Sequence, residues 1–370
     1  MLFVVNVDWF FLSHRLPIAL AAKKAGFDVI VAAADTGRGG EIEQHGLHFI
    51  PIPFSRKGTN LFSELKIVWS LFSLYKKVNP DLVHHVTIKP VLFGSIIARF
   101  HSGLRVVNAI TGLGFTFSEK GRAAPLGWLV RAAYRFALKN PRQRTIFQNP
   151  EDLDFFVTRD FLSEDQSVLI KGSGVNCNWF VPPESETGEV MVLLASRMIW
   201  DKGIHEFYEA AKIIKKRKPS VRFLLAGMSD VGNPNTVPVE TLEEWTDEGV
   251  VEWIGHCENM VELLQESTVV ALPTYYPEGV PKILIEAAAC GRAIVTTDRP
   301  GCREIVRHGV NGILIPHKNV VALSGAIELL LEQPSLAKKY GNAGREIALQ
   351  EFSERIVIRE TMKLYERMLP

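Results

Sequence analysis

One stretch decides the fold: EGVPKILIEAAACGRAIVTTDRPGCREIV, residues 278–306. The apolar, alanine-rich run at 282–290 is typical of a buried helix, and Pro281 suits the first turn of that helix. The run AIVTTD at 293–298 follows almost at once, and its β-branched side chains favour a buried strand. A helix that leads so directly into an apolar strand indicates one repeat of an α/β fold with a parallel sheet.

The same alternation continues outward in both directions along the chain. The strands that we expect are 2–7, 28–33, 47–52, 81–86, 105–110, 145–149, 167–170, 190–196, 221–227, 250–255, 269–273, 293–298 and 312–316. The helices that we expect are 15–25, 61–77, 90–101, 203–216, 258–266 and 282–290. We therefore predict an α/β protein of two Rossmann-like, doubly wound domains that face each other across a cleft. Ligands in such sheets bind beyond the carboxyl ends of the strands.

The length of the chain agrees with two domains. A single hydrophobic core stops growing near about 250–300 residues, and this chain has 370. Prolines, a serine and a glycine cluster at 181–189, which we take as the boundary.

The basic residues are unevenly distributed. Residues 1–180 hold 21 Lys and Arg against 14 Asp and Glu, and within 55–144 the balance is 15 to 3. Such a basic segment indicates an anionic partner, and a solvated basic face is the alternative. No DNA- or RNA-binding motif accompanies it, so we expect no nucleic acid partner.

The four cysteines lack the CxxC spacing of a structural zinc site or a disulfide framework, which fits a reducing cytoplasm and no metal. The opening residues MLFVVNVDWFF read as a first buried strand, because they lack the basic start and the cleavage site of a signal peptide. No apolar run approaches the roughly 20 residues that span a bilayer. Any membrane contact is therefore expected to be peripheral.

Two carboxylates in the deciding stretch are candidates for a binding site. Glu278 precedes the expected helix, and Glu286 lies within it. Unpaired backbone N–H groups at the start of a helix favour a phosphate, and a carboxylate can accept hydrogen bonds from ribose hydroxyls. The residues at this helix start are Gly279, Val280, Pro281, Lys282, Ile283 and Leu284. The alternative is a pair of surface carboxylates at an ordinary helix cap.

Two cations follow another expected strand. In SRMIWDKGI, residues 196–204, Arg197 and Lys202 flank a strand-to-helix turn. Arginine by bidentate contact and lysine as a point charge can neutralise a diphosphate leaving group. A solvated turn at the start of the helix is the structural alternative.

The segment 278–316, taken with these cations, closely resembles the donor site of the family 4 retaining glycosyltransferases, which have the GT-B fold. The resemblance implies that Glu286 holds the ribose of a UDP-sugar and that Glu278 contacts the donor sugar. It also implies that Arg197 and Lys202 stand in place of a metal ion, so that no cofactor is needed. Retention in this family requires no side-chain base, because the departing phosphate accepts the proton of the acceptor.

Three further glycine or histidine positions resemble family features. KGSGVNCNWF at 171–180 is similar to the family's G-x-G-V-D segment, with Gly174 in a tight turn and Asn176 where aspartate is usual. An ordinary linker turn fits these residues as well. Gly227 and His256 stand at strand ends where the family places the nucleobase.

The resemblance also implies how the chain is divided. We expect residues 1–172 plus 352–370 to form an acceptor-binding domain, because the family's last helix crosses back to the first domain. Residues 173–351 would form the donor-binding domain.

The first loop of the N-terminal domain, NVDWFFLSHR at 6–15, departs from the family. It lacks the glycines that many members carry there and has Trp9, Phe10 and Phe11 instead. These side chains suit an acceptor with a long apolar part. His14, at the start of the next expected helix, is either a site residue or a capping or core histidine.

A second departure lies in LVHHVTIKP, residues 82–90. Many members read H-x-H here, but with the first histidine aligned on His84 the second position holds Val86. Neighbouring side chains of a strand point to opposite faces, so at most one of the two consecutive histidines faces the cleft easily. The candidates that this segment and the loop at 108–121 contribute are His85, Thr87, Lys89, Gly112 and Gly114.

Two segments combine apolar and basic residues, 61–77 and 120–144. Basic amphipathic helices with aromatic residues suit an anionic membrane surface. Packing against the sheet explains the apolar residues but not the excess of basic ones. We therefore expect a cytoplasmic protein held peripherally on the inner membrane.

The combination of SHRL, HHVTIKP and TGLGFTFS resembles members that act on polyprenyl-diphosphate-linked sugars, especially N-acetylgalactosaminyltransferases. The sequence thus predicts an enzyme that moves an N-acetylhexosamine from a UDP-sugar to a polyprenyl-diphosphate-linked saccharide in surface polysaccharide or glycan assembly. The alternatives are the same chemistry on a soluble acceptor, a nucleotide-sugar epimerase and a non-catalytic carbohydrate-binding protein.

Overall fold

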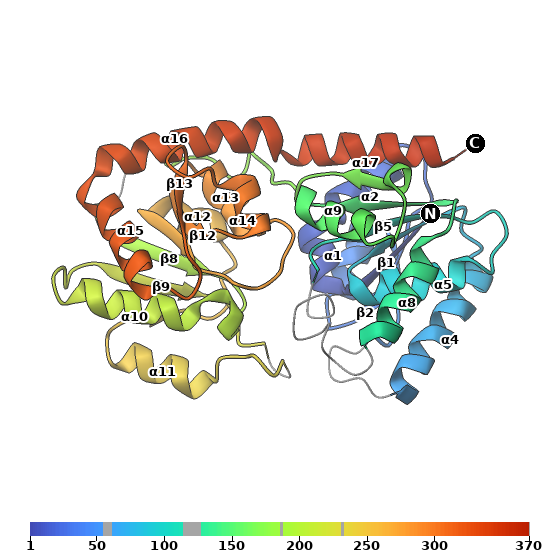
Figure 1. Ribbon diagram of the computed structural model, residues 1–370, viewed down its shortest axis with the longest axis horizontal. Helices are drawn as coiled ribbons and strands as arrows, with labels where there is room; N and C mark the ends of the chain where they lie inside the picture. The colour runs from blue at the N-terminus through green and yellow to red at the C-terminus, as the bar shows by residue number, and fades with distance from the viewer. Residues whose placement is uncertain (55–60, 114–126, 186–187, 231–232, 370) are drawn as a thin grey trace. The chain divides into compact units, whose positions relative to one another are not determined.

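The chain forms two compact units. The computed structural model describes residues 1–54, 61–113, 127–185, 188–230 and 233–369. Unit 1 contains Met1–Ser173, Pro277–Gly279 and Glu354–Pro370, and unit 2 contains Gly174–Tyr276 and Val280–Ser353. Each unit is built on one parallel sheet flanked by helices (Figure 1). This confirms the predicted α/β class with two Rossmann-like sheets.

The described part of unit 1 has a seven-stranded sheet in the order β3-β2-β1-β4-β5-β6-β7. Its strands are β1 (Leu2–Val7), β2 (Ile30–Ala34), β3 (His48–Pro51), β4 (Leu82–Val86), β5 (Arg105–Ile110), β6 (Gln143–Phe147) and β7 (Ser167–Leu169). The strand order reverses between β1 and β4. Doubly wound sheets bind their ligands at the carboxyl ends of the strands beside such a reversal.

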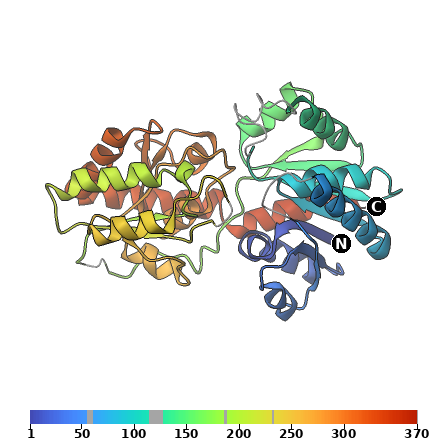
Figure 2. The same cartoon turned by 90° about the horizontal axis from the view of Figure 1, so that it is seen from below.

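Helices cover both faces of the unit 1 sheet. They are α1 (Asp8–His14), α2 (Leu16–Lys24), α3 (Gly39–Gln44), α4 (Leu61–Val78), the π-helical turn η1 (Pro90–Gly94), α5 (Ser95–Ala98), α8 (Gly127–Leu138), α9 (Pro150–Thr158), the 3₁₀ turn η2 (Glu164–Gln166) and α17 (Glu354–Met368). On one face, Phe3 packs with α2 and with Tyr365 of α17. Helix α17, in red, lies against the blue N-terminal part of this unit (Figure 2). On the other face, Val4 packs with Leu71 of α4. The alternation of β1 side chains between two apolar layers makes this strand central.

Unit 2 has a described sheet of six strands in the order β10-β9-β8-β11-β12-β13. The strands are β8 (Met191–Ala195), β9 (Arg222–Ala226), β10 (Glu252–Trp253), β11 (Val269–Leu272), β12 (Ala293–Thr297) and β13 (Gly312–Ile315). The helices are the 3₁₀ turn η3 (Trp200–Lys202), α10 (Ile204–Lys215), α11 (Val239–Asp247), α12 (Met260–Glu266), α13 (Lys282–Ala289), α14 (Pro300–Ile305), α15 (Val320–Glu332) and α16 (Pro334–Glu351). The strand order reverses between β8 and β11, so the same rule points to the carboxyl ends of these two strands as the ligand-binding edge of unit 2.

The deciding stretch folds as the sequence predicts. Helix α13 leads into β12, and all five residues of that strand are buried. Strand β12 pairs in parallel with β11 on one side and with β13 on the other. The β-branched residues therefore lie in the interior of the sheet, where both of their faces are covered.

The segment 6–15 differs from the expected loop. Helix α1 begins at Asp8, directly after β1, and ends at His14, so His14 closes one helix instead of opening the next. The Asp8 carboxylate is fully buried and accepts hydrogen bonds from the amides of Trp9, Thr36 and Arg38 at 2.7, 2.6 and 3.1 Å. Two of these amides lie after β2, so the helix start depends on tertiary contacts.

No single helix in the described ranges is both long and apolar enough to cross a bilayer. The pair α15 and α16, bent by 101°, passes the same test of length and composition. Leu323, Ile327 and Leu330 of α15 are nevertheless buried in the core of unit 2, as in an ordinary core helix.

The two consecutive histidines of β4 point to opposite faces and are both buried. His84 Nδ1 lies 2.5 Å from the Tyr365 hydroxyl. His85 Nδ1 lies 2.8 Å from Asn108 Oδ1, and its Nε2 lies 2.5 Å from the Tyr75 hydroxyl. Because a carbonyl oxygen only accepts, Nδ1 of His85 donates and Nε2 accepts from tyrosine. Burial lowers the pKa of His85 to about 4.

We expect unit 1 to lose stability as the pH falls from about 6.5 to about 4. In this window the unfolded chain binds a proton at position 85 that the folded chain does not, which costs about 1.4 kcal/mol per pH unit and about 3 kcal/mol in all. The free energy of unfolding, measured with urea at several pH values in this window, should depend less steeply on pH for His85→Gln than for the wild type. Replacement of the exposed His45 by Gln is the control. Equal slopes for the wild type and His85→Gln would contradict this assignment.

Candidate active site

The two predicted cations of unit 2 follow β8 on a turn that only glycine can complete. Arg197 stands two residues after the strand, and the buried Lys202 ends η3. Gly203 comes next in a left-handed conformation, with φ of +78°. A Cβ atom at Gly203 would lie 2.4 Å from the carbonyl oxygen of Pro273. The turn is thus pressed against the segment that follows β11.

Backbone hydrogen bonds join these two segments. The amides of Tyr275 and Tyr276 donate to the carbonyl oxygen of Asp201 at 2.8 and 3.0 Å. As a result, the Tyr276 ring lies 5.9 Å from the Arg197 guanidinium carbon and 5.5 Å from Lys202 Nζ. A cation within about 6 Å of an aromatic ring is attracted to its face. The structure therefore brings both predicted cations to one ring that the sequence did not single out.

An ion pair orients Arg197. Its Nη1 lies 2.6 Å from Oδ2 of Asp230, a carboxylate that also accepts from Asn233 Nδ2 at 3.1 Å. The Asp230 amide donates to Thr236 Oγ1 at 2.9 Å, which fixes the carboxylate in its loop. A guanidinium held in this way keeps its remaining N–H donors in a fixed direction, as bidentate phosphate recognition requires. Asp230 follows β9, the neighbour of β8. The pairing of Asp230 with Arg197 could not be predicted from the sequence.

The start of α13 supplies a second feature of the same sheet edge. Pro281 is the N-cap of α13, one position before the first turn where the sequence placed it, and Lys282 is the first helical residue. The Leu284 amide bonds back to the Pro281 carbonyl at 3.1 Å. The earlier amides, of Lys282 and Ile283, have no preceding turn to bond to and give this end a partial positive charge.

Glu286 lies one turn into α13 and is buried. Lys282 Nζ lies 3.0 Å from Glu286 Oε1, an i,i+4 ion pair along the helix. An ionised carboxylate has about four acceptor positions, so this contact leaves room for hydrogen bonds from ligand hydroxyls. Glu278 and Gly279 are grouped with unit 1, whereas Val280 and the residues after it belong to unit 2.

The candidate glycines are left-handed, as tight turns require. Gly174 has φ of +75°, and Gly227 has φ of +140°. A Cβ at Gly227 would clash with the Ser196 carbonyl, and the Gly227 amide donates to the Gly255 carbonyl at 2.6 Å. Gly227 thus ties together the ends of β8, β9 and β10, which is a structural reason for glycine. His256 is exposed directly after this junction.

The unit 1 candidates at the end of β1 lie on α1. Trp9, Phe10 and His14 are partly exposed, and the rings of Phe10 and His14 stack with centroids 4.1 Å apart. His14 Nδ1 also lies 2.6 Å from Ser13 Oγ. The buried Asp8 that holds this helix start was missed, because its partners after β2 are distant in the sequence.

The end of β4 carries a strained residue. Thr87 has φ of +76°, a left-handed conformation that is a genuine outlier for a β-branched side chain. Such strain gathers at functional positions, and Thr87 lies at the carboxyl edge of the sheet beside the β1/β4 reversal. Lys89 forms an ion pair with Glu64 of α4 at 2.6 Å. His85, in contrast, has both ring nitrogens occupied within the core.

The loop after β5 is described only in part. Gly112 has φ of +133°, whereas Gly114 lies outside the described residues, as do 115–126. Within the described ranges, no three His, Cys, Asp or Glu side chains gather as metal ligands would.

Two family models match the chain. The model of group 1 glycosyl transferases matches residues 178–347, and the model of 4-like glycosyl transferases matches residues 1–149. The chain is also 32% identical over 381 residues to the N,N'-diacetylbacillosaminyl-diphospho-undecaprenol alpha-1,3-N-acetylgalactosaminyltransferase of Campylobacter jejuni, covering 97% of this chain and 98% of the relative. The chain belongs to the family 4 glycosyltransferases. The resemblance seen in the sequence is confirmed, and the chain is a glycosyltransferase of polysaccharide assembly.

Solved structures confirm the GT-B fold of this glycosyltransferase. Sucrose-phosphate synthase of Thermosynechococcus elongatus superposes with a TM-score of 0.81 at 20% identity, covering 99% of this chain and 98% of that one. Anabaena HepE in complex with UDP-glucose superposes with a TM-score of 0.77 at 19% identity, covering 99% of both chains. At these identities the likeness shows the fold alone.

Replacement of Gly203 by alanine should both destabilise unit 2 and weaken binding of UDP, the donor nucleotide expected from the sequence, because the Cβ would meet the Pro273 backbone. We expect a loss of more than about 2 kcal/mol of unfolding free energy. Gly309→Ala, at a left-handed position with open surroundings, should lose only about 1 kcal/mol. Gly325→Ala, on the exposed side of α15, should be neutral or slightly stabilising. Thermal unfolding and calorimetric UDP titration measure both effects, and equal losses for positions 203 and 309 would refute the close-contact argument.

Tyr276→Leu should weaken binding of this expected donor nucleotide about two- to fivefold, because the ring that lies near the two cations is removed. Tyr276→Phe keeps the ring and should bind like the wild type. Tyr275 is a matched control, since its ring lies 4.6 Å from Lys318 instead and its amide makes the equivalent bond to Asp201. If Tyr275→Leu and Tyr276→Leu lose the same affinity, the ring contact is not the cause.

Proposed function

We propose that this glycosyltransferase moves an N-acetylhexosamine from a UDP-sugar to a polyprenyl-diphosphate-linked saccharide, with retention of configuration and without a metal ion. In this proposal the protein works peripherally on the cytoplasmic face of the inner membrane. One observation carries it: both donor motifs follow the two strands at which the unit 2 sheet reverses, β8 and β11. This is where a doubly wound sheet binds a nucleotide.

The charges at this edge suit a diphosphate. Arg197 and Lys202 follow β8, and the amino end of α13 follows β11. Two fixed cations and a helix amino end favour an anion whose charge grows as the glycosidic phosphate departs. The Asp230 carboxylate beside Arg197 orients the guanidinium and also offsets part of its charge. Lys202, buried near the same Tyr276 ring, places a second cation at this edge.

The proposed transfer needs no protein side chain as a base. The bond between the sugar C1 and the diphosphate oxygen breaks, and a bond from C1 to the acceptor oxygen forms on the same face. The acceptor proton passes to the departing phosphate oxygen, so UDP leaves with it. Arg197 and Lys202 stabilise the negative charge of UDP, and Glu286 orients the donor through its ribose. Glu278 is proposed to contact the donor sugar.

The acceptor class is supported by the similarity over the whole chain. The Campylobacter jejuni relative, 32% identical, is named for a diphospho-undecaprenol acceptor. In unit 1 of this chain, aromatic side chains of α1 stand at the carboxyl edge of the sheet, which suits an acceptor with an apolar part. A soluble acceptor is the alternative that the assay below separates.

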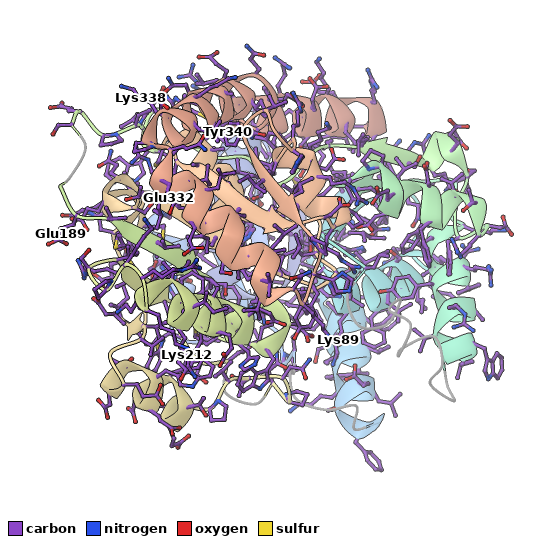
Figure 3. All side chains as sticks on the ribbon, turned by 60° about the vertical axis from the view of Figure 1, so that its left-hand side comes forward. Lys89, Glu189, Lys212, Glu332, Lys338 and Tyr340 are labelled. Carbon is purple, nitrogen blue, oxygen red and sulfur yellow. The ribbon has the colours of Figure 1, made fainter. Side chains whose placement is uncertain are left out.

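The central test is UDP release from a panel of UDP-sugars, with and without polyprenyl-diphosphate-linked saccharides. Lys202→Ala should lower kcat about 10²- to 10³-fold, as expected for loss of transition-state charge stabilisation. Glu286→Ala should raise the donor KM at least about tenfold, since a charge-assisted hydrogen bond is lost. Lys212→Ala on α10 and Glu332→Ala at the end of α15 are controls of the same residue types (Figure 3). Their exposed ion pairs contribute little, and rates within about twofold of wild type are expected.

Several outcomes would contradict the proposal. UDP release only in the presence of soluble sugars would indicate a soluble acceptor instead of a lipid-linked one. Formation of a free, isomerised nucleotide sugar without any acceptor would indicate an epimerase. A β-linked product from an α-linked donor, seen by NMR, would exclude retention. Loss of activity with EDTA that Mg²⁺ restores would exclude metal-independent chemistry.

A further inference from the structure

Two helices of unit 1, α4 and α8, expose large apolar side chains that the core does not need. On α4, Phe62, Leu65 and Trp69 are 81%, 56% and 70% exposed. Their spacing of i, i+3 and i+7 places them on one side of the helix. The opposite side already supplies the core, with Ile67 and Leu71 fully buried. Packing therefore accounts for one apolar stripe of α4 and leaves a second one in water.

Helix α8 repeats this arrangement on the same face of the sheet. Trp128 and Leu129 are 64% and 50% exposed, whereas Tyr134 and Leu138 are buried together with Ile110 of β5. Ile110 and Val106 of β5 point to the same side, because they are four residues apart in a strand. Val106 packs in the cluster that α4 covers, so α4 and α8 lie on one face.

Both exposed groups lie at the carboxyl edge of the sheet. Helices that join parallel strands begin at that edge, and these side chains belong to the first nine residues of α4 and the first turn of α8. Two contacts tie the helices to the segment after β4. Glu64 pairs with Lys89 at 2.6 Å, and the Tyr134 hydroxyl donates to the Ile88 carbonyl at 3.0 Å. Figure 3 shows Lys89 beside α4.

The charge around these side chains selects the partner. Exposed basic residues on α4 are Lys66, Lys76 and Lys77, and Glu64 is the acid of its first turn, paired with Lys89. Over 55–144 the chain carries 15 basic and 3 acidic residues. Tryptophan side chains favour the level of lipid headgroups, and lysines beside them are drawn to anionic lipids. A protein partner would need a complementary acidic and apolar surface, whereas an anionic bilayer offers both properties everywhere.

We propose that Phe62, Leu65 and Trp69 of α4, with Trp128 and Leu129 of α8, form a docking surface that inserts into an anionic bilayer. We call it the α4/α8 surface. Insertion at this edge turns the carboxyl ends of β1, β4 and β5 toward the headgroups, where a lipid-linked diphosphate lies. The inference deepens the peripheral membrane placement proposed above, and it rests on the proposed function for the nature of the acceptor, whereas vesicle binding is measured without any sugar.

The test is co-sedimentation of the full chain with vesicles of phosphatidylcholine alone or mixed with phosphatidylglycerol. The wild type should bind the mixed vesicles and should dissociate from them at high salt. The triple variant Phe62→Ala, Leu65→Ala, Trp69→Ala should bind at least about tenfold more weakly, and Lys66→Gln about fivefold. All four side chains are exposed, so thermal unfolding should be unchanged.

Two variants in unit 2 are matched controls. The exposed fraction of Trp179, 66%, is similar to that of Trp69. Lys338 is an exposed lysine of α16 (Figure 3). Trp179→Ala and Lys338→Gln should bind vesicles like the wild type. The proposal would be overturned if the triple variant bound vesicles as tightly as the wild type. It would also be overturned if Trp179→Ala lost as much vesicle affinity as the triple variant, or if the wild type bound neutral and anionic vesicles equally. Lipid-free dimers that Trp69→Ala dissociates would overturn it too, because the surface would then belong to a second copy of the chain.

An activity assay separates this inference from the proposed function. With the triple variant, transfer to an acceptor in vesicles should fall in step with binding, while transfer to a short-chain acceptor in detergent should equal that of the wild type. A triple variant that keeps full activity on vesicles would overturn the docking role. Absence of UDP release by the wild type with either acceptor, alongside intact vesicle binding, would instead be the failure of the proposed function.

Discussion

The proposed donor site of unit 2 depends on one carbonyl oxygen. The Asp201 carbonyl accepts the amides of both Tyr275 and Tyr276, and this shared acceptor joins the turn after β8 to the segment after β11. Without it, the two proposed donor motifs would be separate loops at the ends of neighbouring strands. With it, the Tyr276 ring lies near both cations, and the chain enters α13 from a fixed point. Gly203 makes the contact possible, because any Cβ there would collide with the backbone of Pro273.

Much of this arrangement could be predicted from the sequence, because its main elements are local. The alternation of β-branched runs and amphipathic stretches predicts both sheets, and the spacing of Glu278 and Glu286 around one helix start predicts a phosphate-binding end. What the sequence could not supply were partners set by the order of strands. Asp230 reaches Arg197 only because β9 lies beside β8. The helix at Asp8 was mistaken for a loop because two of its stabilising amides come from the end of another strand.

The candidates of unit 1 divide according to their position along a strand. His84 and His85 lie within β4, where burial and hydrogen bonds to Tyr365 and Tyr75 keep both as core residues with lowered pKa values. Thr87 stands just past the end of the same strand, in a conformation that β-branched residues avoid. A residue within a parallel sheet is covered on both faces, whereas a residue past its carboxyl edge remains accessible to ligands. The family's H-x-H pattern could not show this difference, because it depends on where β4 ends.

The uneven charge of the chain can be understood from the shapes of its two proposed anionic ligands. Residues 181–370 hold 21 basic and 27 acidic side chains, so the general field of this half disfavours a nucleotide diphosphate. A compact anion can still bind there if a few cations are fixed at short range, since screening removes the distant charges at physiological ionic strength. Arg197, Lys202 and the amino end of α13 provide that local arrangement. A membrane surface is extended and cannot be bound by one fixed cation. The excess of basic residues over 55–144 suits it instead, because many exposed charges act together over a wide area.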